Sequence, residues 1–144
     1  MCEKTGLFTL PGTITDSKLK IIAVVEDNPD NLLLLRVLLQ DRYQLREYAD
    51  GLSAAREIAS DPPDLVLMDI SLPVMDGVQA LHTIREAPGL QQLPIVALTA
   101  HAMVGDRERF LAEGFDFYIT KPILDSAQLI KPIETLLDRS DFER

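Results

Sequence analysis

The sequence is short of cysteine and of long apolar runs. Its only cysteine is Cys2, which excludes a disulfide framework within the chain. No apolar stretch approaches the roughly 20 residues that a membrane-spanning helix needs, and the first residues lack the basic and then apolar segments of a signal peptide. We therefore expect a cytoplasmic protein that does not bind a membrane.

Basic residues are also scarce. The chain has 14 Lys and Arg against 23 Asp and Glu, which gives a formal net charge of −9. Binding of DNA or RNA needs a basic face, so we expect no nucleic-acid partner. The apolar content is 47% over 144 residues, which is enough for the core of one domain of ordinary size.

Apolar runs alternate with helical patterns through most of the chain. Strands are expected at 20–25, 43–48, 65–69, 94–99 and 115–119, and helices at about 28–40, 52–59, 78–84, 103–113 and 129–137. This alternation predicts an α/β fold in which a parallel sheet is doubly wound, with helices on both faces.

The domain limits follow from the same pattern. Residues 1–18 show no sustained period and are predicted to form a flexible tail. Residues 19–139 form the expected domain, and residues 140–144 a short C-terminal tail. Pro132 lies inside the last helical pattern, where it should kink the helix or delay its start.

Four of the expected strands end in polar residues. These are Glu26 and Asp27 after the first, Asp69 in the third, Thr99 in the fourth, and Thr120 and Lys121 after the fifth. The carboxyl ends of parallel strands meet at one edge, where open α/β sheets place their sites. Three acids, a hydroxyl and an ammonium together suit a divalent metal and a phosphoryl group.

Taken together, these residues resemble the receiver domain of bacterial two-component response regulators. The matching residues are Glu26-Asp27, Asp69 within MDISLPVMDG, Thr99-Ala100, Tyr118 and Lys121-Pro122. The resemblance covers about residues 20–138, and LTAHAMVGD at 98–106 most resembles receivers of hybrid kinases and stand-alone regulators. It implies a flavodoxin-like (βα)5 fold with five strands in the order 2-1-3-4-5.

The resemblance also implies a role for each matching residue. Asp69 would be the phosphoryl acceptor, and Lys121 and Thr99 would contact the phosphoryl oxygens. Mg²⁺ would be held by Asp27, Asp69 and the backbone carbonyl of Ser71, with Glu26 acting through a bound water. A cis peptide bond before Pro122 would aim Lys121 into the site, and Tyr118 would be the switch aromatic that turns inward when Thr99 moves.

Several of these residues have a plainer interpretation that remains open. Thr99 is also a common type of helix cap, and Tyr118 is at home in an edge strand. His101 either tunes the access of water to phosphorylated Asp69 or is a solvated loop residue. His82 is expected to be an ordinary residue on a helix face, and Asp76-Gly77 a turn and the start of a helix rather than a ligand.

The first expected helix carries more leucine than one buried stripe needs. Leucine or valine occupies positions 32–35 and 37–39, so these residues cover more than one face. One interpretation is a deeply packed helix. The other, which we favour, is a docking patch, because receivers meet the helical phosphodonor domain partly through this helix.

The resemblance predicts a phosphorylation switch. A histidine kinase or a histidine phosphotransfer protein would donate to Asp69 with Mg²⁺ bound, and the surface formed by the helix at 103–113, the strand at 115–119 and the last helix would change its affinity for a partner. We expect no output domain after the last helix, and therefore action through a partner or onward transfer in a relay.

Two other functions are considered. The first is a receiver-like scaffold that binds proteins without phosphorylation, although the intact set of Asp27, Asp69, Thr99 and Lys121 disfavours it. The second is an enzyme, but aspartate-nucleophile phosphatases place an aspartate where Ser71 stands, and the sequence has no GxxxxGK[ST] loop. We expect no catalysis beyond slow self-dephosphorylation.

Overall fold

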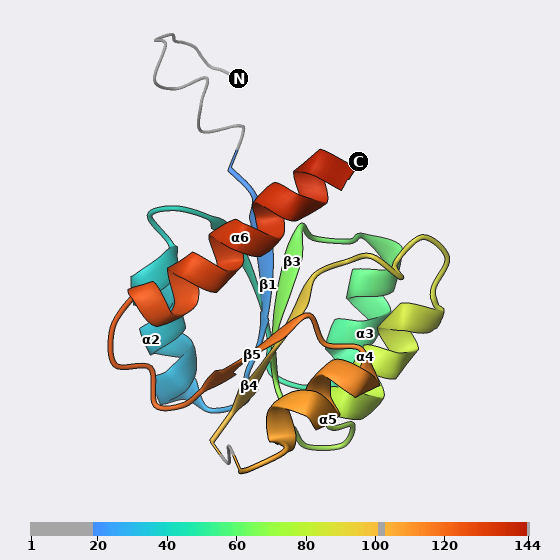
Figure 1. The fold of residues 1–144 in the computed structure, drawn as a ribbon, viewed down its shortest axis with the longest axis horizontal. Helices are drawn as coiled ribbons and strands as arrows, with labels where there is room; N and C mark the ends of the chain where they lie inside the picture. Colours follow the sequence, from blue (N-terminus) through green and yellow to red (C-terminus); the bar gives the residue numbers. More distant parts are fainter. Residues whose placement is uncertain (1–18, 101–102, 144) are drawn as a thin grey trace, which may run out of the picture.

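A computed structural model describes residues 19–100 and 103–143 of the chain (Figure 1). Strands and helices alternate through these residues. The strands are β1 (Ile21–Val25), β2 (Gln44–Tyr48), β3 (Leu65–Asp69), β4 (Ile95–Thr99) and β5 (Phe117–Thr120). The helices are α2 (Pro29–Leu39), α3 (Gly51–Ser60), α4 (Gly77–Glu86), α5 (Asp106–Glu113) and α6 (Ala127–Glu143).

The strands form one parallel sheet in the order β2-β1-β3-β4-β5. This confirms the predicted fold class and strand order. The order reverses direction between β1 and β3, because β2 lies outside β1 and the later strands follow on the other side. A reversal of this kind opens a crevice at the carboxyl ends of the two strands, where ligands bind in such sheets.

Helices cover both faces of the sheet and make two cores. α2 and α6 lie on one face, and α3, α4 and α5 lie on the other (Figure 1). Alternate residues of each strand point to opposite faces, so Val24 belongs to the core under α2 and α6, whereas Val25 belongs to the core under α3, α4 and α5. The three central strands are buried on both faces, which explains their continuous apolar runs.

Two boundaries differ from the sequence prediction for local reasons. α5 begins at Asp106 rather than near 103 because Gly105 adopts the left-handed conformation, with φ of 90°, which a helix cannot include. β5 begins at Phe117 rather than 115. Phe115 instead closes the end of α5, where its N–H donates to the carbonyl of Phe110 at 3.1 Å, and its ring is buried in the core.

The last helix also differs from the prediction. α6 continues to Glu143, so residues 140–143 are helical where the sequence suggested a tail. Pro132 lies inside α6 and does not delay its start. The helix begins at Ala127 because the Asp125 carboxylate accepts the N–H groups of Ala127 and Gln128, at 2.8 and 3.3 Å, as a capping residue does.

Among the residues that the structure describes, no helix combines the length and the apolar character needed to cross a bilayer.

Candidate functional site

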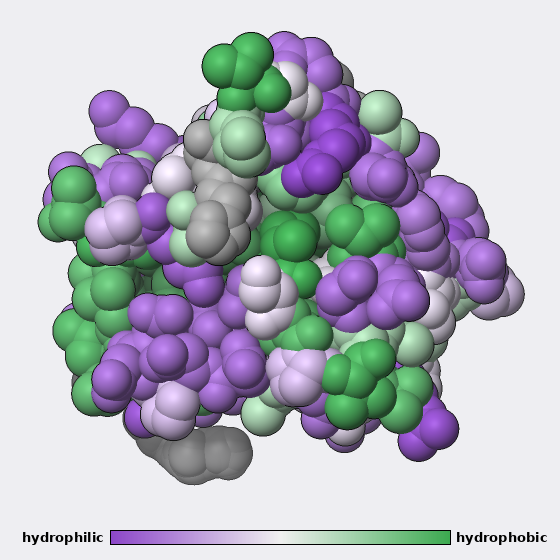
Figure 2. Space-filling view, turned by 90° about the horizontal axis from the view of Figure 1, so that it is seen from below, coloured by the Kyte–Doolittle hydropathy of each residue, from purple (hydrophilic) through white to green (hydrophobic). Residues whose placement is uncertain are grey.

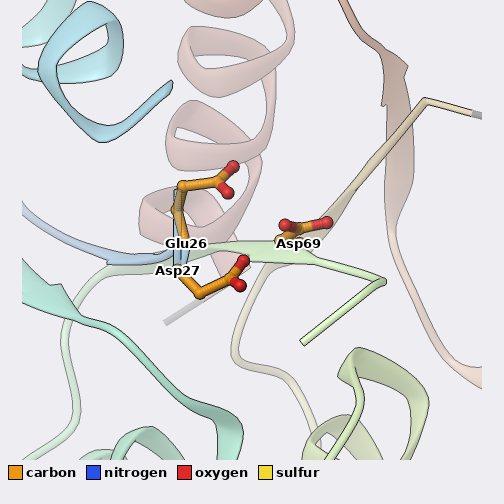
Figure 3. Close-up of side chains that lie close together, drawn as sticks. All are labelled: Glu26, Asp27 and Asp69. Carbon is orange, nitrogen blue, oxygen red and sulfur yellow. The ribbon is translucent and has the colours of Figure 1, made fainter. Parts of the chain in front are cut away.

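Three carboxylates meet at the carboxyl edge of the sheet. Glu26 and Asp27 directly follow β1, and Asp69 is the last residue of β3, the strand beside it. One carboxylate oxygen from each residue lies within 4.8 Å of the others, and Figure 3 shows the three side chains gathered between the two strand ends. Glu26 and Asp69 are only 1% and 4% exposed, whereas Asp27 is exposed.

Lys121 brings a positive charge to this cluster. Its Nζ lies 3.0 Å from Glu26 Oε1 and 3.4 Å from Asp69 Oδ2. Lys121 follows β5, and its backbone N–H donates to the carbonyl of Thr99 at 2.7 Å, so the end of β4 holds the backbone that carries the ammonium. The Lys121–Pro122 peptide bond is cis, as the resemblance implies.

The acidic cluster carries an electrostatic cost. Burial raises the pKa of Glu26, and the hydrogen bond to Asp69 and the charge of Asp69 raise it further. The ammonium of Lys121 and the N–H of Asn28, which donates to Glu26 Oε2 at 3.2 Å, act in the opposite direction. The cluster thus has three acids, two of which contact Lys121, and the remaining negative charge favours a cation.

The donor set fits Mg²⁺ in particular. Mg²⁺ prefers oxygen ligands, takes few carboxylates and keeps several waters. Here two carboxylates are buried and the third opens to solvent, which leaves room for water on one side. Among the residues that the structure describes, the cluster holds no histidine or cysteine, so it does not favour a softer metal.

The loop between β3 and α4 shapes the pocket around Asp69. The N–H of Ser71 donates to Asp69 Oδ1 at 3.1 Å and fixes the orientation of that carboxylate. Gly77 lies so close to the strand end that an added Cβ would sit 2.5 Å from the backbone oxygen of Asp69. Asp76 caps α4 in a capping box with Gln79, which agrees with the predicted helix start at these positions.

Thr99 and Tyr118 share one face of the sheet. Tyr118 of β5 pairs in register with Ala97 of β4, and Thr99 lies two residues beyond Ala97 on β4. Thr99 is 5% exposed at the edge that carries the acids. Tyr118 lies further back, half-buried, with its ring centroid 6.1 Å from that of Phe110. The two residues are thus diagonal neighbours on adjacent strands.

The structure therefore brings Glu26, Asp27, Asp69, Thr99 and Lys121 to one edge, as the strand pattern predicts, and Tyr118 lies behind them. His101 lies outside the described residues. His82 is on α4 and pairs with Glu113 of α5 at 2.9 Å, in keeping with the ordinary surface role expected of it. The backbone donors of Asn28 and Ser71 were not predictable, because a backbone N–H leaves no signal in residue identity.

Comparison with known proteins identifies the family. Residues 22–134 match the response regulator receiver domain, and the chain therefore belongs to that family. It is 44% identical over 117 residues to the histidine-protein kinase BarA of Escherichia coli K12, covering 80% of this chain but 13% of BarA. It is 38% identical over 105 residues to the polar-differentiation response regulator DivK of Brucella anthropi, covering 72% of this chain and 85% of DivK.

A solved structure gives the same fold. The receiver domain of the sensor histidine kinase PA1611 from Pseudomonas aeruginosa superposes with a TM-score of 0.76 at 37% identity, covering 83% of this chain and 98% of that domain. That structure holds a magnesium ion coordinated in its active-site cleft. As a receiver domain, this chain is a signalling domain.

Proposed function

We propose that this chain is the phospho-acceptor switch of a two-component system, in which Asp69 takes a phosphoryl group from a phosphohistidine with Mg²⁺ bound. The supporting observation is the placement of Asp69: buried, beside two further carboxylates, and 3.4 Å from the ammonium of Lys121. The P–N bond of the donor breaks, imidazole leaves, and a carboxylate oxygen of Asp69 forms the new bond to phosphorus.

The metal ligands are assigned from the carboxylate cluster and from the resemblance to receiver domains. Asp27 and Asp69 would hold Mg²⁺ through their carboxylates, the backbone carbonyl of Ser71 would be a third ligand, and Glu26 would act through a water. When bound, Mg²⁺ supplies the positive charge that lets an anionic phosphoryl group approach three acids. The neighbouring receiver with a magnesium ion in its cleft supports this assignment.

Lys121 and Thr99 complete the site. Lys121 offers a compact positive charge to the phosphoryl oxygens, and Thr99 offers a hydroxyl. Phosphorylation adds up to about two negative charges and three acceptor oxygens. Tyr118, one strand away on the same face as Thr99, follows the movement of Thr99 and changes the surface formed by α5, β5 and α6.

The exposed side of α2 is proposed as the docking surface for the phosphodonor, a histidine kinase or a histidine phosphotransfer protein. α2 buries Leu35 and Leu39 but leaves Leu33 and Val37 more than half exposed, so deep packing does not account for all of its apolar residues. A crevice beside it is lined by residues of both α2 and the site, including Leu34 and Lys121. Seen from below, the surface carries apolar residues along its left side, the side on which α2 lies in Figure 1 (Figure 2).

The proposal also covers the limits, the location and the activity of the domain. Residues 19–139 form the receiver domain, and this domain works in the cytoplasm without binding nucleic acid or a membrane. Its only catalysis is slow self-dephosphorylation. The domain spans 13% of BarA, so the proposal concerns the domain and not the activity of a longer kinase.

The proposal is tested by phosphorylation with acetyl phosphate or a cognate kinase. The protein should incorporate acid-labile phosphate only with Mg²⁺, and Asp69→Asn should abolish the incorporation. Asp76→Asn is the matched control, because Asp76 is an exposed carboxylate on the next loop and asparagine caps a helix as well as aspartate does. Labelling that survives Asp69→Asn contradicts the proposal, and a wild type that neither binds Mg²⁺ nor takes up phosphate favours the scaffold alternative.

A further inference from the structure

Gly51 is the first residue of α3, and it is buried with no room for a side chain. A Cβ added there would overlap the carbonyl oxygen of Met75, and it would lie 3.4 Å from the Cβ of Ala80. The obstructing atom belongs to the backbone, so it cannot rotate away as the end of a side chain does. The contact between Gly51 and Met75 therefore sets how closely the start of α3 approaches the loop between β3 and α4.

The start of α3 is fixed from its other side. Asp50 caps the helix, with its Oδ1 accepting the N–H of Ser53 at 2.7 Å. Ala54, Ala55 and Ile58 are buried against the sheet. Because this helix is capped and packed in the core, a side chain at position 51 would displace the loop rather than the helix.

The loop transmits such a displacement toward Asp69. It is closed on itself by a hydrogen bond from the N–H of Gly77 to the carbonyl of Ile70, at 3.0 Å, and by another from Met75 to Pro73, at 2.7 Å. Ser71 lies within this closed loop, and its N–H orients Asp69 Oδ1. A shift at Met75 therefore changes the position of Ser71 relative to Asp69.

We propose that Gly51 is a positioning residue of the phosphorylation site: by seating the Met75 carbonyl, it sets the distance between the Ser71 backbone and the Asp69 carboxylate. The inference rests on the proposed function, since Ser71 and Asp69 are two of the groups assigned to Mg²⁺. Mg²⁺ demands near-ideal octahedral geometry, so a small shift between two of its ligands weakens binding. Gly51 itself touches neither the metal nor the phosphoryl group.

Gly51→Ala tests the proposal by two measurements. The dissociation constant for Mg²⁺, from calorimetric titration, should rise by about tenfold or more, the range found when a group that orients a metal ligand is removed. In EDTA, amide hydrogen exchange at Ser71 should become faster, because its hydrogen bond to Asp69 is strained without any metal present.

Two control variants separate positioning from stability. Ala112→Gly weakens an exposed turn of α5 and should lower the melting temperature without changing Mg²⁺ affinity. Met75→Ala removes the side chain but keeps the backbone carbonyl in contact with Gly51. This variant should leave Mg²⁺ affinity within about twofold of wild type, well below the tenfold effect expected for Gly51→Ala. If Gly51→Ala unfolds, the titrations are repeated in trimethylamine oxide, which favours the folded state.

The outcomes distinguish this inference from the proposed function. Folded Gly51→Ala protein with wild-type Mg²⁺ affinity overturns the positioning role, and so does an equal loss in Met75→Ala. A wild type that fails to bind Mg²⁺ overturns the proposed function itself. Weakened binding in Gly51→Ala alone, together with faster exchange at Ser71, supports the role of Gly51.

Discussion

Lys121 and Glu26 lie 95 positions apart in the sequence, and their side chains form an ion pair with 3.0 Å between Nζ and Oε1. Glu26 is 1% exposed, and the same ammonium lies 3.4 Å from Asp69. Two buried carboxylates, those of Glu26 and Asp69, thus share one ammonium group as their neighbour. Such a cluster costs stability, as expected of a site whose charge a bound cation completes.

Replacing Lys121 tests this charge balance. Lys121→Met removes the ammonium and leaves Glu26 and Asp69 buried without it. In EDTA at pH 8 we expect the free energy of unfolding to fall by about 1–3 kcal/mol, the cost of leaving a buried polar group without its partner, as measured by urea denaturation. Mg²⁺ should bind at least as tightly as in wild type, because a neighbouring positive charge has been removed, while phosphorylation slows.

The control for this variant is Lys131→Met, at an exposed position of α6, which should change neither stability nor phosphorylation. Weaker Mg²⁺ binding in Lys121→Met would contradict the charge balance described here.

Glu26→Gln should make the metal-free protein more stable at neutral pH. The pKa of Glu26 is raised in the folded state, mainly by burial, so the folded protein holds a proton that the unfolded chain releases above about pH 4.5. The stability of the wild type therefore falls as the pH rises from that value to the folded-state pKa. A neutral amide at this position avoids that loss.

The measurement is the melting temperature of both proteins in EDTA from pH 4 to pH 8. We expect the advantage of Glu26→Gln to grow as the pH rises and to vanish near pH 4. An advantage that stays constant with pH would show that Glu26 titrates normally. Mg²⁺ affinity should drop in the variant, because the site then has one carboxylate fewer.

Val74→Gly should stabilise the fold. Val74 has φ of 68°, a left-handed conformation that costs a residue with a Cβ about 1–2 kcal/mol. Glycine removes that cost but adds about 0.5–1 kcal/mol of unfolded-state entropy, so the net gain is between zero and about 1.5 kcal/mol, measured by urea denaturation. Val104→Gly is the matched control: Val104 is also fully exposed on a loop but has no positive φ, and its replacement should bring no gain.

The docking surface on α2 is tested with Leu33→Ser and Val37→Ser combined. Both side chains are more than half exposed, so the fold should tolerate the change. Loss of about 1 kcal/mol of contact energy at the interface raises KM for transfer from the cognate phosphohistidine protein by roughly fivefold. Labelling by acetyl phosphate, which needs no docking, should stay unchanged.

Leu111→Ser on α5 provides the comparison, because Leu111 is also a partly exposed leucine but lies on the opposite face of the sheet. If that variant raised KM as much as the changes on α2, the donor would dock elsewhere.

The strand ends were predictable from the sequence because local and tertiary signals agree there. β3 occupies the predicted residues, since a fully buried parallel strand reads as an unbroken apolar run. The proximity of the acids then follows from the topology alone, because residues at the carboxyl ends of neighbouring parallel strands, here β1 and β3, lie at the same edge of the sheet. Lys121 needed the resemblance as well, since a lysine after a strand is not distinctive by itself.

Other features depend on contacts that no local pattern records. The close approach of Gly51 to the Met75 carbonyl joins two segments remote in the sequence. Arg85 likewise donates to the carbonyls of Leu90, Leu93 and Gly114 and pairs with Asp116, although in the sequence it is one more arginine on a helix. The length of α6 was underestimated because its polar end carries no hydrophobic period.

The most direct test of the account is to find which residue carries the phosphoryl group. Wild-type protein is phosphorylated with Mg²⁺, the acyl phosphate is reduced with borohydride, and the altered residue is located by tandem mass spectrometry. The account predicts modification at Asp69, and none when EDTA replaces Mg²⁺. Modification at Glu26, at Asp27 or outside the cluster, or full modification in EDTA, would contradict it.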